Sequence, residues 1–120
     1  MTTKAQAVEL CLGFAGAYED HPFDENFVAI RHAGNKRIFA LVYDLDGQAR
    51  INVKADPKHI YDYREAFPAV TPGYHMNKNH WNTITLDDSM TDEEILALVG
   101  ESFDLTKPKT PRNGIKKAKK

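Results

Sequence analysis

The sequence predicts an α+β domain in which an antiparallel sheet has its helices packed on one face. The expected elements follow the order α-β-β-β-α-β-α, and the first three strands are joined by short turns, which makes neighbouring strands run antiparallel. The 120 residues include 42% hydrophobic residues, which is enough for one core without disulfides. We therefore expect a single domain over residues 1–106 and a distinct tail over residues 107–120.

The first helix is predicted from the capping-box spacing of Thr3 and Gln6. Apolar residues then recur at helical intervals, and Cys11 is one of them. We interpret Cys11 as a core residue and not as a nucleophile, and a lone cysteine is typical of a reducing compartment. Gly13 and Gly16 are expected to end the helix, and the acidic segment 18–26 is expected to be a loop.

Three strands are predicted next, over residues 27–32, 37–45 and 49–55. The second is apolar almost throughout, whereas the third alternates between apolar and polar residues, as a strand with one buried and one wet face does. The dipeptide Asp46-Gly47 between them is typical of a two-residue hairpin.

The later elements have clear start signals. Asp56 followed by Pro57 predicts a helix with the aspartate as N-cap and the proline as its first residue. Residues 80–86 are expected to form the fourth strand. Thr91 and Glu94 have the spacing of a second capping box, which predicts the start of the last helix.

The sheet face away from the helices is expected to be polar and partly basic. If Ile51 and Val53 face the helices, then Arg50 and Lys54 face outward, and Trp81 of the last strand joins them. A half-exposed tryptophan next to cations suits stacking on a planar ligand or base. The alternative is that Trp81 closes one end of the core against the preceding loop.

The segment Thr71–Asn82, Thr-Pro-Gly-Tyr-His-Met-Asn-Lys-Asn-His-Trp-Asn, is the strongest candidate for a binding surface. It combines hydrogen-bonding and stacking groups with few aliphatic residues, and Gly73 is expected to take a positive φ in a type II turn. Lys78 is needed least by the fold, so it is the first expected ligand contact. The alternative is a structural loop whose histidines and asparagines only bond the backbone. The candidate binding residues in this segment are Tyr74, His75, Asn77, Lys78, His80, Trp81 and Asn82.

Charge is distributed unevenly along the chain. The formal net charge of −1 combines seven basic residues and no acid in residues 107–120 with nine basic and 17 acidic residues elsewhere. The tail has too few apolar residues to order itself, so we expect it to be disordered. It is either a solubilising end or a non-specific tether for nucleic acid, which would use Lys109, Arg112, Lys116, Lys117, Lys119 and Lys120.

Several separated segments together resemble the MmcQ/YjbR family of small bacterial proteins. The resemblance lies chiefly in residues 71–82, and also in Tyr18-Glu-Asp-His-Pro-Phe23, Arg37-Ile-Phe-Ala-Leu-Val42 and Asn52-Val-Lys-Ala-Asp-Pro57. It implies a fold similar to that of CyaY, the bacterial frataxin, and DNA binding by a double-wing arrangement. Iron binding is not carried over, because Glu9 is the only acid of the first helix.

The sequence departs from the family pattern at two positions. Asp24 stands where glycine often follows Pro-Phe, and Asn79 stands where a second basic residue often follows Lys78. The second departure removes one phosphate contact. The family pattern also places Asp20 where it could reach the candidate surface and orient an imidazole.

Two binding functions follow from these observations. The first is weak, salt-sensitive DNA binding through Arg50, Lys54, Lys78 and the tail. An acidic body argues against a tight DNA reader, because each phosphate contact needs a cation. The second is binding of a small anionic or aromatic ligand, or of a peptide, by residues 71–82.

Catalysis and metal binding are not expected. His75 and His80 are five residues apart, which is not the spacing of a helical zinc site, and no cysteine pair assists them. The chain has no Gly-rich phosphate loop and no nucleophile elbow. No apolar run approaches the roughly 18 residues of a membrane span. We therefore expect a monomeric cytoplasmic protein without a cofactor, a metal, a membrane partner or enzymatic activity.

Overall fold

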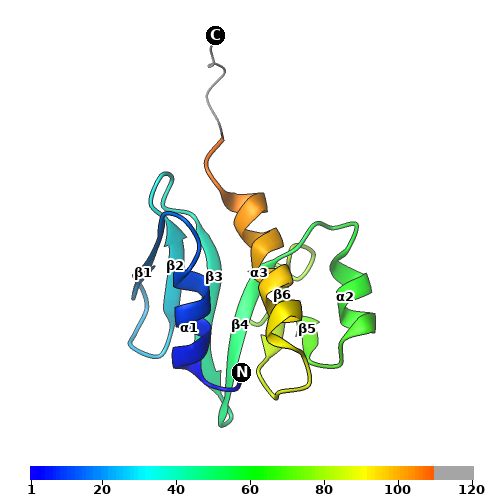
Figure 1. The fold of residues 1–120 in the computed structure, drawn as a ribbon. Coiled ribbons are helices and arrows are strands. Elements are labelled where there is room, and N and C mark those ends of the chain that lie inside the picture. Colours follow the sequence, from blue (N-terminus) through cyan, green and yellow to red (C-terminus); the bar gives the residue numbers. More distant parts are fainter. Residues whose placement is uncertain (110–120) are drawn as a thin grey trace.

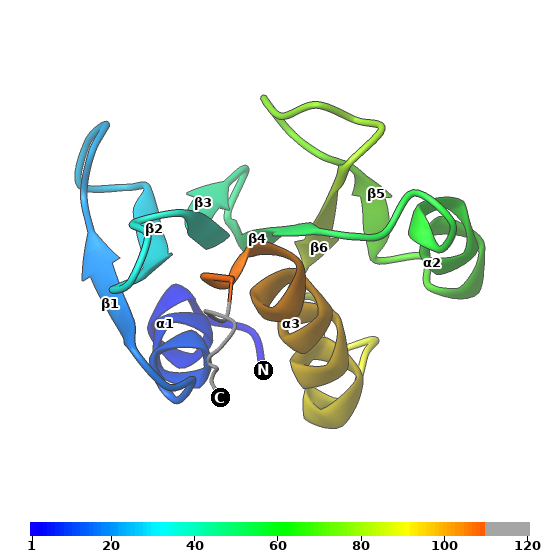
Figure 2. The same cartoon turned by 90° about the horizontal axis from the view of Figure 1, so that it is seen from above.

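The computed structural model describes residues 1–109, which form three helices and six strands. In chain order these are α1 (Lys4–Leu12), β1 (Ala17–Asp20), β2 (Val28–His32), β3 (Ile38–Leu45), β4 (Gln48–Lys54), α2 (Ile60–Ala66), β5 (Val70–Pro72), β6 (Trp81–Thr85) and α3 (Asp92–Thr106). The strands form one antiparallel sheet in the order β1-β2-β3-β4-β6-β5 (Figure 1). Helices α1 and α3 cover the same face of the sheet, and α2 lies beside the edge strand β5 (Figure 2). The predicted α+β class is confirmed.

Two edge strands were not predicted. β1 lies within the segment expected to be a loop, and β5 is a three-residue strand at the start of the candidate binding segment. β1 contains two adjacent acids and no buried residue, so it has no alternation of apolar and polar positions. Pairing with β2 over four residues makes it a strand, which is a tertiary effect that local composition does not encode.

The main core lies between the sheet and the helices α1 and α3. Ile51 and Val53 of β4 and Ile84 of β6 are buried in it, as the predicted alternation requires. Cys11 is buried in the same core, and this burial raises the pKa of its thiol to about 12. Cys11 is therefore a core residue, as predicted.

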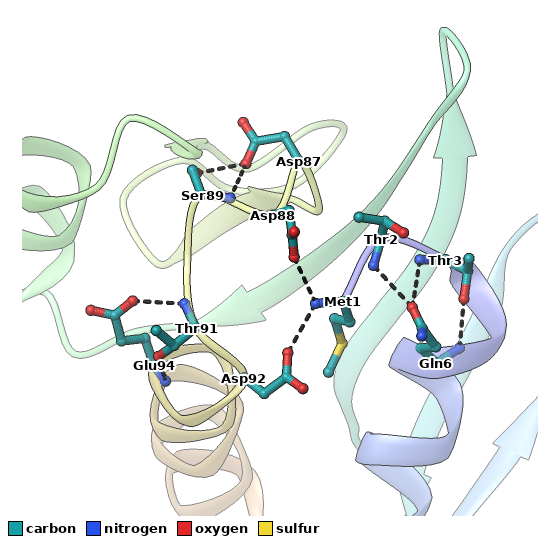
Figure 3. Close-up of polar contacts among 10 residues, drawn as sticks. All are labelled: Met1, Thr2, Thr3, Gln6, Asp87, Asp88, Ser89, Thr91, Asp92 and Glu94. Carbon is teal, nitrogen blue, oxygen red and sulfur yellow. Dashed lines mark hydrogen bonds and ion pairs between the residues drawn. The ribbon is translucent and has the colours of Figure 1, made fainter.

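Both predicted capping boxes are present (Figure 3). The backbone amide of Gln6 donates to the Thr3 hydroxyl, and Glu94 makes the equivalent bond to Thr91. The α-amino group of Met1 also lies between two aspartates, 2.9 Å from a carboxylate oxygen of Asp92 and 3.4 Å from one of Asp88 (Figure 3). These contacts join the start of α1 to the start of α3.

The predicted start of the second helix was wrong by one turn. α2 begins at Ile60, and the side chain of its N-cap, His59, makes no capping bond. The Asp56 carboxylate instead accepts a hydrogen bond from the backbone amide of Lys58, and its carbonyl accepts one from Ile60. The Asp-Pro signal therefore forms a separate turn, and the helix follows it.

The predicted hairpin between β3 and β4 is confirmed. Asp46 and Gly47 have φ values of 53° and 79°, which are the two positive values that a type I′ turn requires. Over the described residues, no helix has both the length and the apolar character needed to cross a bilayer.

Candidate functional site

The sheet face opposite α1 and α3, called the outer face below, has a polar half and an apolar half. On the polar half, Arg50 and Lys54 of β4 lie opposite Thr85 and Trp81 of β6, as the alternation predicts. The apolar half is a second hydrophobic cluster formed by Ala29, Leu41 and Tyr43. This cluster cannot be recognised in the sequence, because β3 is buried on both faces and so shows no alternation.

Two loops rise on the outer face, one between β1 and β2 and the other between β5 and β6 (Figure 2). We call them the acidic loop (residues 21–27) and the histidine loop (residues 73–80). A pocket of about 310 Å³ lies between them, which is at the lower end of the size range of ligand sites. It is lined by Phe23, Asp24, Phe27, Leu41, His75 and Met76. Both loops and the sheet therefore contribute to one site.

A continuous row of rings crosses the outer face from one loop to the other. Phe23 meets Phe27 edge-on with ring centroids 6.3 Å apart, and Phe27 stacks on Tyr43 at 5.0 Å. Tyr43 stacks on Tyr74 at 5.7 Å, and Tyr74 lies 4.1 Å from the His75 ring. The row packs the two loops against the same strand, because Tyr43 belongs to β3.

The buried side chain of Asn52 holds the start of the histidine loop on the sheet. Its Nδ2 donates to the Tyr74 carbonyl over 2.8 Å, and its Oδ1 accepts from the hydroxyls of Tyr43 at 2.8 Å and Thr83 at 2.6 Å. The Thr83 oxygen also accepts from the Tyr74 amide at 2.9 Å. Burial raises the pKa of the Tyr43 phenol, which keeps it a donor to Asn52.

Gly73 is required by close packing and not by the positive φ predicted for it. A Cβ at this position would lie 2.8 Å from both the Cβ and the carbonyl oxygen of Trp81. The residue with a positive φ in this loop is His75, at 57°. Histidine adopts this region more readily than most residues, and here the conformation places the ring at the pocket.

Arg64 of α2 holds the other end of the histidine loop, a role that no local motif in the sequence indicates. Its Nε donates to Oδ1 of Asn82 over 2.6 Å, and its Nη2 donates to the carbonyls of Lys78 and Trp81. Asn82 in turn donates to the Ile60 carbonyl and is fully buried on the helix side of the sheet. Asn82 therefore does not belong to the exposed surface on which it was predicted. The strand alternation that points Trp81 outward turns Asn82 inward.

The exposed residues of the histidine loop have different roles. Lys78 donates from Nζ to the carbonyl of Gly73 at 3.1 Å, so its ammonium group closes the loop on itself. Asn77 accepts from the Asn79 amide in a local turn. His80 is exposed but does not line the pocket. Of the histidine-loop residues predicted as contacts, the pocket wall includes His75 alone.

None of the predicted cations within residues 1–109 lines the pocket. Lys54 and Trp81 are half-buried neighbours on the polar half of the outer face. Arg50 lies on the same half, and its buried Nε has no hydrogen-bond partner among residues 1–109. Lys109 is exposed after the end of α3. The other predicted tail contacts lie outside the described residues: Arg112, Lys116, Lys117, Lys119 and Lys120.

Asp24 of the acidic loop, and not Asp20 at the end of β1, shares a site with an imidazole. Asp20 forms an ion pair with Arg31 at 2.8 Å, whereas Asp24 lines the pocket together with His75. Within residues 1–109, no three side chains of histidine, cysteine, aspartate or glutamate are grouped so that they could hold a metal ion.

The sequence profile of the YjbR family matches residues 12–105, which is most of the chain. The chain belongs to the YjbR family. The matched range includes both loops and every residue that lines the pocket. The candidate site therefore lies within the family domain, whereas the tail lies outside it.

Curated relatives cover most of this YjbR-family chain. The uncharacterized protein YyaQ of Bacillus subtilis is 35% identical over an alignment of 104 residues, which covers 77% of this chain and 87% of YyaQ. The uncharacterized protein YjbR of Escherichia coli K12 is 27% identical over 101 residues, or 84% of each chain.

Two solved structures have the same fold as this YjbR-family chain. The crystal structure of Deinococcus radiodurans protein DR2400, a DUF419 domain, matches with a TM-score of 0.77 and 30% identity over 88% of this chain and 78% of its own. A crystal structure of a Pseudomonas syringae protein matches with a TM-score of 0.76 and 28% identity over 87% and 98% of the two chains.

A second feature of this family member is a basic end next to the β2–β3 turn. Pro108 packs on that turn, since a Cβ on Gly34 would lie 2.7 Å from the proline Cγ. Asn35 also donates to the carbonyl of Thr106 at 2.9 Å. The turn and the end of α3 lie at the same end of the molecule (Figure 1). The exposed cations at this end are Lys36, Arg37, Lys107 and Lys109.

Proposed function

We propose that this protein binds a small ligand in the pocket between the acidic loop and the histidine loop. The observation that carries the proposal is the apolar pocket of about 310 Å³ on the outer face. Ligand sites are concave, largely apolar and supplied with a few polar groups that orient the ligand. Here Asp24 and His75 are the polar groups in an otherwise apolar wall.

Both loops are held in place by side chains that do not line the pocket. Asn52 and Arg64 hold the histidine loop at its two ends. On the acidic loop, the Asp24 Oδ1 accepts from the amides of Asn26 at 2.9 Å and Phe27 at 3.2 Å. The Asn26 side chain then exchanges two hydrogen bonds with the backbone of Asp44, each 3.0 Å long. A pocket with fixed walls loses little freedom when a ligand binds, which supports binding by a preformed site.

The proposal is tested by a nuclear magnetic resonance screen of small aromatic molecules against the isotope-labelled full chain. We expect amide shifts in residues 21–27 and 73–80. Phe23→Ala should weaken the binding, and Leu96→Ala on α3 is the matched control, because these side chains are 68% and 46% exposed and neither supports the core. Removing a ring contact should weaken binding about tenfold. Shifts confined to other surfaces, or equal effects of the two substitutions, would contradict the proposal.

DNA binding is a second candidate, and the basic end of the molecule is the observation that favours it. Lys36, Arg37 and Lys109 are exposed there, although Lys107 lies 3.4 Å from the carboxylate of Asp104. The test is a titration of duplex DNA at several salt concentrations. The slope of log affinity against log salt is negative, and each lost phosphate contact should reduce its magnitude by about 0.9.

The two basic surfaces predict different effects of substitution. If DNA contacts the basic end, Lys36→Ala with Arg37→Ala should weaken binding, whereas Arg50→Ala with Lys54→Ala on the outer face should not. The reverse result would assign DNA to the outer face. Absence of binding at low salt would exclude this second function.

A further inference from the structure

We infer that the group bound in this pocket is a small organic cation, an ammonium ion attached to an aromatic ring or a short alkyl chain. This inference rests on the proposed function and names its ligand class. It differs from the anionic ligand that the composition of residues 71–82 indicates. The reasons lie in the charge of the pocket wall, in its aromatic rings and in its size.

The only side chain of fixed charge in the pocket wall is the carboxylate of Asp24. Its Oδ1 is used by two backbone amides of its own loop, and Oδ2 has no hydrogen bond or ion pair within residues 1–109. One carboxylate oxygen is therefore free to accept from a bound ammonium group.

The lysine and arginine side chains of the two loops and of β2 bind other protein groups and do not line the pocket. Lys78 donates to the Gly73 carbonyl, and Arg31 is paired with Asp20. No lysine or arginine lines the pocket. An anionic ligand would therefore be placed beside the Asp24 carboxylate without a compensating charge, which disfavours it.

The rest of the wall suits a cation with apolar surface. Phe23 and Phe27 line the pocket, and aromatic rings attract an ammonium ion through their negative faces. Met76 adds a polarisable thioether, and Leu41 contacts the apolar part of a ligand. The volume of about 310 Å³ accommodates one ring and a short chain, which fits a small molecule.

The test compares three ligands that share a phenylethyl skeleton and differ in charge: 2-phenylethylammonium, 2-phenylethanol and phenylacetate. Binding to the labelled full chain is followed from the amide shifts of residues 21–27 and 73–80. We expect the ammonium ion to bind about tenfold more tightly than the alcohol, from one exposed charge pair together with the cation–π contact. Phenylacetate should bind most weakly.

Asp24→Asn separates the charge of this side chain from its role in the loop. The amide oxygen can still accept from Asn26 and Phe27, so the loop keeps its conformation while the charge is lost. The substitution should weaken binding of the ammonium ion about fivefold and leave binding of the alcohol unchanged. Glu25→Gln is the matched control, because it removes the same charge from the same loop outside the pocket wall.

Some results of these binding measurements would overturn the cation assignment without overturning the proposed ligand site. Equal or tighter binding of the alcohol or of phenylacetate would overturn the cation assignment and leave the binding site in place. Equal effects of Asp24→Asn and Glu25→Gln would also overturn it, since a general field of the acidic loop would then explain the preference. If none of the three molecules shifts the resonances of the two loops, the cation assignment fails, and the screen of small aromatic molecules decides separately whether the proposed function fails with it.

Discussion

Replacing Asn52 with leucine tests whether one buried amide fixes the histidine loop on the sheet. Leucine has a similar shape, so the change removes hydrogen bonds and leaves little cavity. The Tyr43 hydroxyl and the Tyr74 carbonyl lose the partners they have at 2.8 Å, and the Thr83 hydroxyl loses its acceptor at 2.6 Å but still accepts from the Tyr74 amide. Each buried polar group left without a partner costs roughly 1–3 kcal/mol. The Tyr74 carbonyl is part-buried and can recruit water, so we expect a total loss of about 2–4 kcal/mol.

This loss is large against the roughly 5–15 kcal/mol that stabilises a domain. It is measured by urea unfolding of the variant, followed by circular dichroism. Hydrogen exchange of the Tyr74 amide should also become faster, because that amide belongs to the same network. Asn77→Ala is the control: it removes one exposed bond in the same loop and should cost about 0.5 kcal/mol or less. A loss below about 0.5 kcal/mol for Asn52→Leu would refute the reasoning.

Three further predictions concern the packing of single residues. Gly73→Ala should lower the free energy of unfolding by about 1–3 kcal/mol through overpacking, and it should shift the resonances of the histidine loop. Gly47→Ala is the control, because a Cβ there meets open space but the φ is 79°. It should lower the free energy of unfolding by a similar amount through backbone strain and leave the histidine loop unchanged. Burial, and secondly the charge of Arg37, lowers the pKa of His32. The contribution of His32 to the free energy of unfolding is therefore complete above the unfolded-state pKa of about 6.5, and it is lost as the pH falls through the folded-state pKa. His32→Gln should therefore flatten the pH dependence of unfolding below that value, and an unchanged slope would contradict the assignment. Cys11 should react with a thiol reagent only as fast as the protein unfolds, because it is buried and the pKa of its thiol is about 12; rapid labelling of the native protein would contradict this.

Elements with local signals were predictable from the sequence. The two capping boxes, the Asp46-Gly47 turn and the alternation in residues 49–55 each involve neighbours in the chain, so their chemistry is visible without a fold. The same alternation correctly placed Arg50 and Lys54 on the outer face. The edge strand β1 depends on pairing with β2, and its sequence alone resembles a loop.

The candidate site was only half predictable for the same reason. The sequence singled out His75, but the other side of the pocket comes from Phe23 and Asp24, which join it only when β1, β2 and β3 pair in register. Asp24 was noticed as a departure from the family pattern, without a role. Leu41 could not be assigned to the outer face, because its strand is apolar on both sides.

The two edge strands of the sheet affect whether this protein forms fibres at high concentration. An open row of backbone donors and acceptors at the margin of a sheet can recruit a strand from another molecule and start a fibre. One margin here is β1, with Glu19 and Asp20 side by side, and the other is β5, which is three residues long and ends at Pro72. Adjacent charges repel an incoming copy, and proline offers no amide hydrogen for pairing. The sheet can thus be six strands wide and still resist growth from either side.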